Sequence, residues 1–202
     1  MTISAIAFDW GGIFTENTFD SSAIRNLAHA TEQSEAQVSS VYMPLMEHFE
    51  AGAFDFDTFV HRFLRDSGAK LGGSEVREIF LGSVLERRAM FDLLASIPET
   101  YTVGMLSNNV EMLCDAVRDD PRMSRIDHFI FSNEIKVRKP DPKAFAALTE
   151  ALGLPPEETV FVDDNEANIA ACEALGYRGI LLSSYDAFAS SWRALLPDVP
   201  LP

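Results

Sequence analysis

Short apolar runs that alternate with helical patterns constrain the fold of this 202-residue chain more than any other feature. The runs are largely continuous in apolar residues, which is typical of strands in a parallel sheet covered on both faces. Strands that alternate with helices predict right-handed crossovers and an α/β fold with a doubly wound parallel sheet. The expected strands are residues 3–8, 102–106, 129–131, 159–162 and 179–182. The expected helices are residues 88–96, 110–118, 142–152, 165–175 and 186–195.

Residues 15–85 break this alternation, because they contain no clear strand pattern. The segment has the spacing of amphipathic helices and is rich in phenylalanine, and we expect most of these rings to form its own core. We therefore predict a small helical cap domain at residues 15–85, inserted into a core domain of residues 1–14 and 86–202. The expected cap helices are residues 23–30, 35–47, 57–66 and 74–85.

Charge and composition indicate which kinds of molecule the protein is not expected to bind. The formal net charge is −15 and the isoelectric point is about 4.5. Binding to nucleic acid or to anionic membranes requires basic patches, so we expect neither partner. The two cysteines lack the CxxC spacing of redox or metal sites and are expected to be reduced core thiols. No apolar run approaches the roughly 20 residues that a membrane span needs. We expect a cytoplasmic protein that is a monomer or a homodimer.

Chemically reactive side chains follow four of the expected strands. Asp9 comes directly after the first, Ser107 after the second, and Asp163 with Asp164 after the fourth, while Lys139 lies in the loop after the third. Ligands of open parallel sheets bind beyond the carboxyl ends of the strands, so we expect these groups to meet at one edge. Each residue alone would be weak evidence, but their joint placement predicts a catalytic site.

Asp9 is the predicted nucleophile. A carboxylate can attack phosphorus and form an acyl phosphate, which divides one difficult displacement into two easier ones. Gly11 and Gly12 follow it, and glycines let a ligand approach the backbone closely, so Gly12 is a predicted substrate contact. Taken alone, an aspartate before glycines also suits a turn. The other three groups favour the nucleophile.

Asp163 and Asp164 are predicted metal ligands. Two adjacent carboxylates repel each other unless a cation or a proton shares their site. Magnesium prefers oxygen ligands and takes one or two carboxylates together with substrate phosphate, so Asp9, the carbonyl of Gly11 and the acidic pair are a suitable set. The same acidic residues also suit the N-terminus of the following helix, and both roles are compatible.

Ser107, Asn108 and Lys139 are predicted to hold the substrate. The hydroxyl, amide and backbone N–H groups of Ser107 and Asn108 can bind phosphate oxygens at a helix N-terminus, although they can equally cap that helix. Asp141 as an N-cap with proline in the first helical turn explains the segment that follows Lys139. It does not explain the lysine, whose ammonium group we predict to be catalytic and to neutralise charge on a transferred phosphoryl group.

These four segments resemble the motifs of the haloacid dehalogenase (HAD) superfamily. FDWGG resembles motif I, LSNN motif II, KVRKPDP motif III and VFVDDNEANI motif IV. The helical insertion is similar to the C1 cap of that family, so the resemblance covers the whole chain. It implies a HAD-like Rossmannoid core with strand order 5-4-1-2-3 and Mg²⁺-dependent phosphoryl transfer through an aspartyl-phosphate. The DWGG pattern with a C1 cap is similar to the branch that includes glucose-1-phosphate phosphatase-like proteins.

One position departs from the pattern of the family phosphatases. They usually carry a second aspartate two residues after the nucleophile, where this chain has Gly11. General acid–base catalysis contributes about 10²- to 10⁴-fold, so the difference matters. The substrate can be an ester with a good leaving group, such as a sugar 1-phosphate or an acyl phosphate. Alternatively, water or another carboxylate, for example Glu16, replaces the aspartate, or catalysis is weak.

The sequence therefore predicts a Mg²⁺-dependent phosphatase of small phosphorylated metabolites. One alternative is a non-enzymatic or weakly active degenerate member of the family, suggested by Gly11 alone. A second alternative is a 2-haloacid dehalogenase, in which Asp9 would displace halide from carbon without a metal. Asp163 and Asp164 argue against the dehalogenase, because an unbalanced acidic pair would repel a carboxylate substrate.

Overall fold

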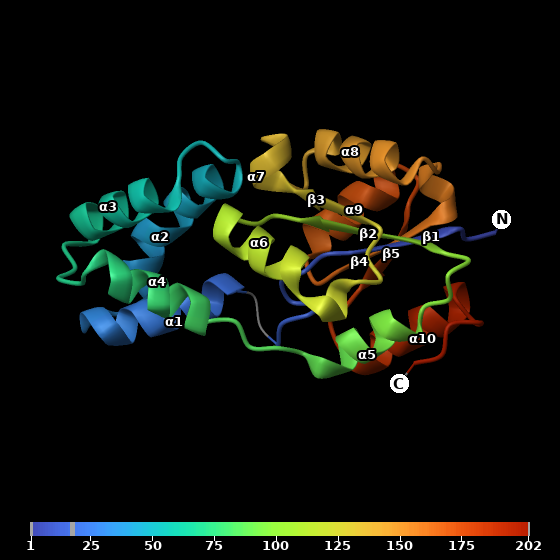
Figure 1. Ribbon diagram of the computed structural model, residues 1–202, viewed down its shortest axis with the longest axis horizontal. Helices are drawn as coiled ribbons and strands as arrows, with labels where there is room; N and C mark the ends of the chain where they lie inside the picture. Colours follow the sequence, from blue (N-terminus) through green and yellow to red (C-terminus); the bar gives the residue numbers. More distant parts are fainter. Residues whose placement is uncertain (1, 17–18, 202) are drawn as a thin grey trace.

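A five-stranded parallel sheet forms the centre of the computed structural model, which describes residues 2–16 and 19–201. The order β3-β2-β1-β4-β5 confirms the predicted α/β class and, read from the other edge, the expected strand order. Buried residues of α5, α6 and α10 pack on one face, and those of α8 and α9 pack on the other (Figure 1). The strands are β1 (Ala5–Phe8), β2 (Thr102–Ser107), β3 (His128–Phe131), β4 (Thr159–Asp163) and β5 (Arg178–Leu181). The covering helices are α5 (Arg88–Ser96), α6 (Glu111–Asp119), α8 (Pro142–Leu152), α9 (Glu166–Ala174) and α10 (Tyr185–Leu195).

The register of the sheet brings the ends of β1, β2 and β4 to one edge. Phe8, the last residue of β1, lies level with Met105 of β2 and Val162 of β4. The backbone N–H of Asp9 donates to the carbonyl of Val162 at 2.9 Å, so the chain stays attached to β4 for one residue beyond the strand. Asp9 is thereby fixed at the carboxyl end of the central strand.

Most boundaries agree with the sequence within two residues. In the helical insertion, the first helix begins at Phe19, four residues before the expected residue 23, and the second ends at Glu50, three residues after the expected residue 47. β2 and β4 each extend one residue further than expected, so Ser107 and Asp163 are the last residues of their strands. β1 begins at Ala5, and β5 begins at Arg178. Short elements that the sequence did not indicate are α7 (Ser132–Ile135) and the 3₁₀ turns η1 (Pro121–Met123) and η2 (Pro156–Glu158).

Among the described residues between β1 and α5, four helices pack together at one end of the molecule (Figure 1). Phe59 and Phe80 are fully buried there, and both rings contact the ring of Tyr42. The expected aromatic core is therefore present, although Phe54 is half-buried. Phe19 also lines a pocket described below. The helices are α1 (Phe19–Thr31), α2 (Glu35–Glu50), α3 (Phe56–Ser67) and α4 (Gly73–Gly82).

Two segments of the chain connect these helices to the sheet, and the two segments are hydrogen-bonded to each other. Thr15 and Glu86 form an antiparallel bridge, and the backbone N–H of Glu16 donates to the carbonyl of Leu85 at 2.7 Å. The guanidinium group of Arg87 donates to the carbonyls of Gly12, Thr15 and Glu16. This pairing explains why α4 ends at Gly82, three residues before its expected end at residue 85. The division at residues 15 and 85 stays a prediction.

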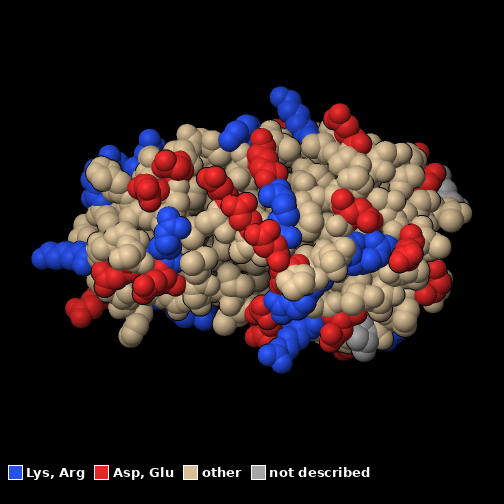
Figure 2. Space-filling model, viewed as in Figure 1, with Lys and Arg blue, Asp and Glu red and all other residues tan. Residues whose placement is uncertain are grey.

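The distribution of charged side chains on the surface and the burial of the two cysteines agree with what we expected from the composition. Acidic and basic side chains are interspersed on the face in Figure 2, and no broad basic patch covers that face. Cys114 and Cys172 are free and buried, as expected. Within residues 2–16 and 19–201, no helix combines the length and the apolar character needed to cross a bilayer.

We predict that Phe59→Ala destabilises the protein by about 3–5 kcal/mol, because it removes a fully buried ring and leaves a cavity. Chemical denaturation would measure the free energy of unfolding. Leu81→Ala is the control, because this side chain on α4 is 47% exposed and its loss should change stability by about 0.5 kcal/mol or less. Equal losses for the two variants would contradict the packing described here.

Candidate active site

Three carboxyl groups meet at the carboxyl edge of the sheet. Asp9 follows β1, Asp163 ends β4, and Asp164 comes next in the chain. One carboxylate oxygen from each of them lies within 4.8 Å of the other two. The structure therefore brings together the three acidic side chains that the sequence placed in a metal site.

Lys139 binds two of these carboxyl groups from the loop between α7 and α8. Its Nζ lies 3.0 Å from Asp9 Oδ1 and 2.7 Å from Asp163 Oδ2. The lysine side chain is fully buried, so both contacts form in a region of weak solvent screening. The amide of Asn108 holds the lysine backbone, because Asn108 Oδ1 accepts from the N–H of Lys139 at 2.8 Å and its Nδ2 donates to the carbonyl at 3.0 Å.

Several neighbours hold the side chain of Asp163 in place. It is 0% exposed, and besides Lys139 it accepts hydrogen bonds from the backbone N–H of Asn165 at 2.8 Å and from Asn168 Nδ2 at 3.0 and 3.1 Å. Asn165 also caps α9, because its side chain accepts from the backbone N–H of Ala167. Asp163 is thus a rigid part of the rim, whereas Asp164 beside it is half-buried and faces the pocket.

Burial and mutual charge shift the proton affinities of these groups. Burial raises the pKa of Asp9 to about 7, although the ammonium group of Lys139 opposes this effect. Burial also raises the pKa of Asp164, and repulsion from Asp163 adds to the shift. For Lys139, burial acts to lower the pKa, but attraction to Asp163 and Asp9 outweighs it and the pKa is raised. Folding therefore favours the protonated, cationic form of the lysine.

The two glycines after Asp9 have different surroundings. Gly12 has a φ of +72°, and the carboxyl group of Asp164 occupies the space that a side chain at Gly12 would fill. Only glycine combines this backbone conformation with so close an approach of the acidic loop. A Cβ at Gly11 would meet nothing within 4 Å, so a side chain at this position would enter open space.

Two buried donors lie near Asp9 at this edge of the sheet. The hydroxyl of Ser107, at the end of β2, interacts with the carboxyl group of Asp9 and acts to lower its pKa, whereas Nδ2 of Asn109 has no hydrogen-bond partner among the described residues. Buried polar groups are normally paired, so an unpaired donor at the rim indicates a place for an acceptor ligand. The predicted role of Ser107 in phosphate binding fits this geometry. The amide of Asn108 is engaged with the backbone of Lys139, and its role as a direct phosphate ligand stays a prediction.

A pocket of about 220 Å³ opens beside these groups. Its lining includes Asp9, Gly11 and Asp164 at the sheet edge. Two helices of the insertion supply other lining residues: α1 contributes Phe19 and Asp20, and α2 contributes Met43, Met46 and Glu50. Helices α1 and α2 therefore form part of the wall of the candidate active site.

Two further carboxyl groups lie in this wall. Asp20 Oδ1 accepts a hydrogen bond from the hydroxyl of Tyr42 at 2.9 Å. Glu50 Oε2 accepts from Arg138 Nε at 2.7 Å, and the Nη2 atom of Arg138 lies 2.7 Å from the same oxygen. Burial raises the pKa of Asp20, and burial together with repulsion from Asp20 raises the pKa of Glu50 to about 7.

The residues present fit a divalent cation. Asp9, Asp163 and Asp164 supply hard oxygen ligands, and Lys139 directly contacts two of these carboxylates but not the third. The set therefore keeps excess negative charge at the rim, which Mg²⁺ would balance. The carbonyl of Gly11 lies in the adjoining loop and is available as a fourth predicted ligand.

Sequence reasoning missed several residues of this site. Asn109 and Asn168 stand within the motifs, but no spacing signal separates them from ordinary helix-capping residues. Asp20, Glu50 and Arg138 reach the pocket through packing of distant elements. Glu16, the suggested substitute for the absent aspartate, is exposed and does not line this pocket.

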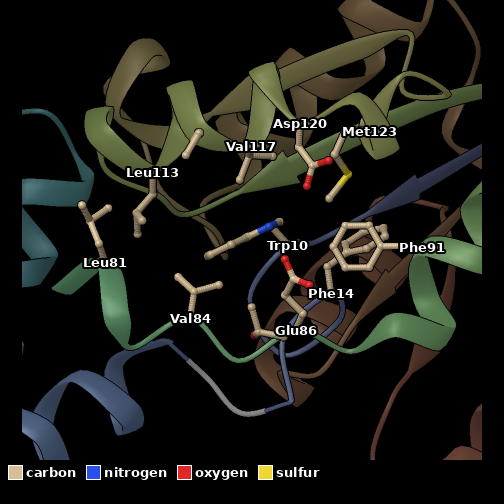
Figure 3. Close-up of a pocket in the computed structure, with 12 residues that line it drawn as sticks. Trp10, Phe14, Leu81, Val84, Glu86, Phe91, Leu113, Val117, Asp120 and Met123 are labelled. Atoms are coloured by element: carbon tan, nitrogen blue, oxygen red, sulfur yellow. The ribbon is translucent and has the colours of Figure 1, made fainter. Parts of the chain in front are cut away.

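A second hollow of about 210 Å³ shares Trp10 and Leu113 with the first pocket. Figure 3 shows Trp10 at its centre, with Phe91 and Met123 to one side and Leu81 and Val84 to the other. Its two carboxylates, Glu86 and Asp120, both bind Arg122. The lining is otherwise mostly apolar, so the groups suited to phosphoryl chemistry belong to the first pocket.

We predict that stability depends on the proton held by Glu50. The carboxyl group of Glu50 has a pKa of about 4.5 in the unfolded chain and about 7 in the folded protein, so it binds its proton more tightly when folded. Its contribution to stability is therefore largest below pH 4.5, falls as pH rises from 4.5 to 7, and is constant above that range. The decrease is on the order of 3 kcal/mol. Denaturant titrations at several pH values should show it in the wild type and in Glu47→Gln, whose site is exposed on α2. The decrease should be smaller by about that amount in Glu50→Gln, where other buried acids such as Asp9 still contribute, and parallel curves for all three proteins would contradict the prediction.

Comparison with known proteins agrees with this geometry. A D-ribitol-5-phosphate phosphatase of Bacteroides thetaiotaomicron is 23% identical over 185 residues, which cover 87% of this chain and 89% of that protein. The (S)-2-haloacid dehalogenase 1 of Pseudomonas sp. strain CBS-3 is 33% identical over 84 residues, and this match spans 41% of the chain and 37% of the dehalogenase. Less than half of that enzyme is therefore represented in the match.

The fold recurs in a HAD-family enzyme of Bacteroides thetaiotaomicron that was solved with magnesium and inorganic phosphate. The two structures agree with a TM-score of 0.76 at 23% identity, over 89% of this chain and 93% of that one. A family model described as haloacid dehalogenase-like hydrolase matches residues 3–176. This match spans all four motifs and most of the chain, and the protein therefore belongs to the haloacid dehalogenase-like hydrolases.

Proposed function

We propose that the protein is a Mg²⁺-dependent phosphatase of small phosphorylated metabolites, with Asp9 as nucleophile. The observation that carries the proposal is the composition of one rim. Asp9 and Asp164 line one pocket together with Asn109, whose Nδ2 is unpaired among the described residues. Lys139 contacts both Asp9 and Asp163, and Ser107 interacts with Asp9. A phosphate group requires cations and hydrogen-bond donors, and its attack requires an anionic nucleophile.

The proposed reaction has two steps. A carboxylate oxygen of Asp9 attacks phosphorus, the bond from phosphorus to the leaving oxygen breaks, and the leaving group takes up a proton. Water then attacks the aspartyl-phosphate, loses a proton, and releases inorganic phosphate and the free carboxylate. Lys139 neutralises charge on the phosphoryl oxygens, and Ser107 and Asn109 donate hydrogen bonds to them.

Asp9, Asp163, Asp164 and the carbonyl of Gly11 would hold the metal. Bound there, Mg²⁺ supplies positive charge that reduces repulsion between the carboxylates and the incoming phosphate. The ribitol-phosphate phosphatase relative and the neighbour solved with magnesium and phosphate support this assignment by similarity. Because Gly11 offers no acid, sugar 1-phosphates and acyl phosphates are the expected substrates, since their leaving oxygens need little protonation.

Dehalogenation is the second candidate, because a stretch of 84 residues is 33% identical to a haloacid dehalogenase. The rim disfavours it: a 2-haloacid is itself a carboxylate, and it would meet Asp9, Asp163 and Asp164 with one lysine between them. A degenerate, inactive protein is the third, motivated by Gly11.

We predict metal-dependent phosphate release that requires Asp9. Wild type would be incubated with p-nitrophenyl phosphate, sugar 1-phosphates and 2-chloropropionate, in Mg²⁺ or in EDTA. Asp9→Asn should lose at least about 10³-fold in kcat with the fold preserved by circular dichroism, because an amide is not a nucleophile. Halide release that is insensitive to EDTA would identify a dehalogenase, and no turnover of any of these substrates would identify a degenerate protein. Full activity of Asp9→Asn would remove Asp9 from the mechanism.

We further predict that Gly11→Asp raises activity on esters with poor leaving groups by about tenfold or more, because it adds an acid in open space two residues after Asp9. The measurement is kcat/KM for an alkyl phosphate relative to p-nitrophenyl phosphate. Gly11→Asn is the matched control, since it has the same shape without the acidic proton. An unchanged ratio in Gly11→Asp would show that leaving-group protonation does not limit this enzyme.

A further inference from the structure

The wall of the active-site pocket formed by α1 and α2 carries two carboxyl groups that the phosphoryl chemistry leaves unused. We propose that Asp20 and Glu50 form the leaving-group subsite, which binds the hydroxyl groups of an uncharged, hydroxyl-rich leaving group and excludes leaving groups that carry a second negative charge. The inference rests on the proposed phosphatase function and adds the chemical class of the substrate.

Placement is the first argument. Asp20 lies in the first turn of α1 and Glu50 is the last residue of α2, and both line the same pocket as Asp9 and Asp164. The phosphate group would be held at the sheet edge, so the rest of the substrate extends into the part of the pocket that α1 and α2 enclose. The volume of about 220 Å³ is below the roughly 300–1,000 Å³ of sites for drug-sized ligands, so the leaving group is small.

Charge is the second argument. Arg138 is the one cationic side chain in the described lining of this pocket, and Glu50 already binds it through two nitrogens. A carboxylate or second phosphate on the leaving group would therefore meet at least one ionised carboxyl group of this pair without a free cation to balance it. Repulsion between like charges disfavours such substrates.

Hydrogen-bonding capacity is the third argument. The pKa values of both carboxyl groups are raised, so the pair holds a proton more readily than two exposed acids would. A protonated carboxyl beside an ionised one offers a donor and acceptors together, which matches hydroxyl groups. Tyr42 and Arg138 fix the two side chains in advance, so little ordering is needed when the substrate binds.

The apolar part of the lining agrees with the same class of ligand. Phe19, Met43 and Met46 stand beside the two acids in the pocket wall. Sugars and polyols present C–H faces between their hydroxyl groups, and these faces can pack on an aromatic ring and on flexible thioethers. A leaving group that is uncharged, polar at its edges and apolar on its faces fits both sets of side chains.

The test compares matched substrates within one enzyme preparation. Glucose 1-phosphate is paired with glucuronic acid 1-phosphate, and glycerol 3-phosphate with 3-phosphoglycerate, so each pair exchanges a CH₂OH group for a carboxylate. Wild type should prefer the uncharged member by about tenfold or more in kcat/KM. Asp20→Asn and Glu50→Gln should each reduce this preference by about tenfold, through a higher KM for the uncharged member and better turnover of the charged member. Because both rates come from the same sample, the ratio does not depend on the fraction of folded enzyme.

Glu47→Gln and Asp57→Asn are the controls, because both residues are exposed on α2 and α3, outside the lining of this pocket. They should keep the wild-type ratio. Metal-dependent turnover of p-nitrophenyl phosphate tests the phosphatase function separately, and its absence would overturn that function and this inference with it. With that turnover present, a preference for the charged members, no turnover of either pair, or unchanged ratios in Asp20→Asn and Glu50→Gln would overturn the subsite alone.

Discussion

The contact of Lys139 with Asp9 and Asp163 is the interaction on which the site depends. Three carboxyl groups at one sheet edge repel each other, and burial strengthens that repulsion because solvent screens it poorly. A single ammonium group at 3.0 and 2.7 Å offsets it for two of them. Asn108 holds the lysine backbone and Asn168 holds Asp163, so the charge balance has a fixed geometry. Three carboxylates against one ammonium group leave excess negative charge at the rim, which suits a metal ion.

This fixed rim is only half of the pocket, and the other half comes from helices that lie at the end of the molecule. The bridge between Thr15 and Glu86, with Arg87 bound to three carbonyls, ties the two connecting segments together close to Asp9. The position of α1 and α2 is therefore linked to the loop that carries the nucleophile. We propose that residues at the sheet edge carry out the chemistry and that residues of α1 and α2 select the leaving group.

Much of the sheet edge could be predicted from the sequence, because a parallel sheet imposes a simple rule. Residues that follow apolar runs must lie at the carboxyl edge, so Asp9, Ser107 and Asp163 could be placed there. Lys139 follows less directly, since it comes from a loop, and its burial between two acids is a tertiary fact. Asp20 and Glu50 could not be predicted, because on helices of amphipathic pattern they are indistinguishable from solvated acids such as Glu47.

The sequence by itself determined the α/β class, the strand order by resemblance, and the family motifs with their candidate nucleophile and metal ligands. These follow from periodicity and from residue types at strand ends, which are local properties. Only the tertiary structure decided which buried donor of the site remains unpaired, which acids have raised pKa values, and which carboxyl groups line the pocket. Those properties depend on burial and on distances between side chains from separate elements, and no local pattern encodes either quantity.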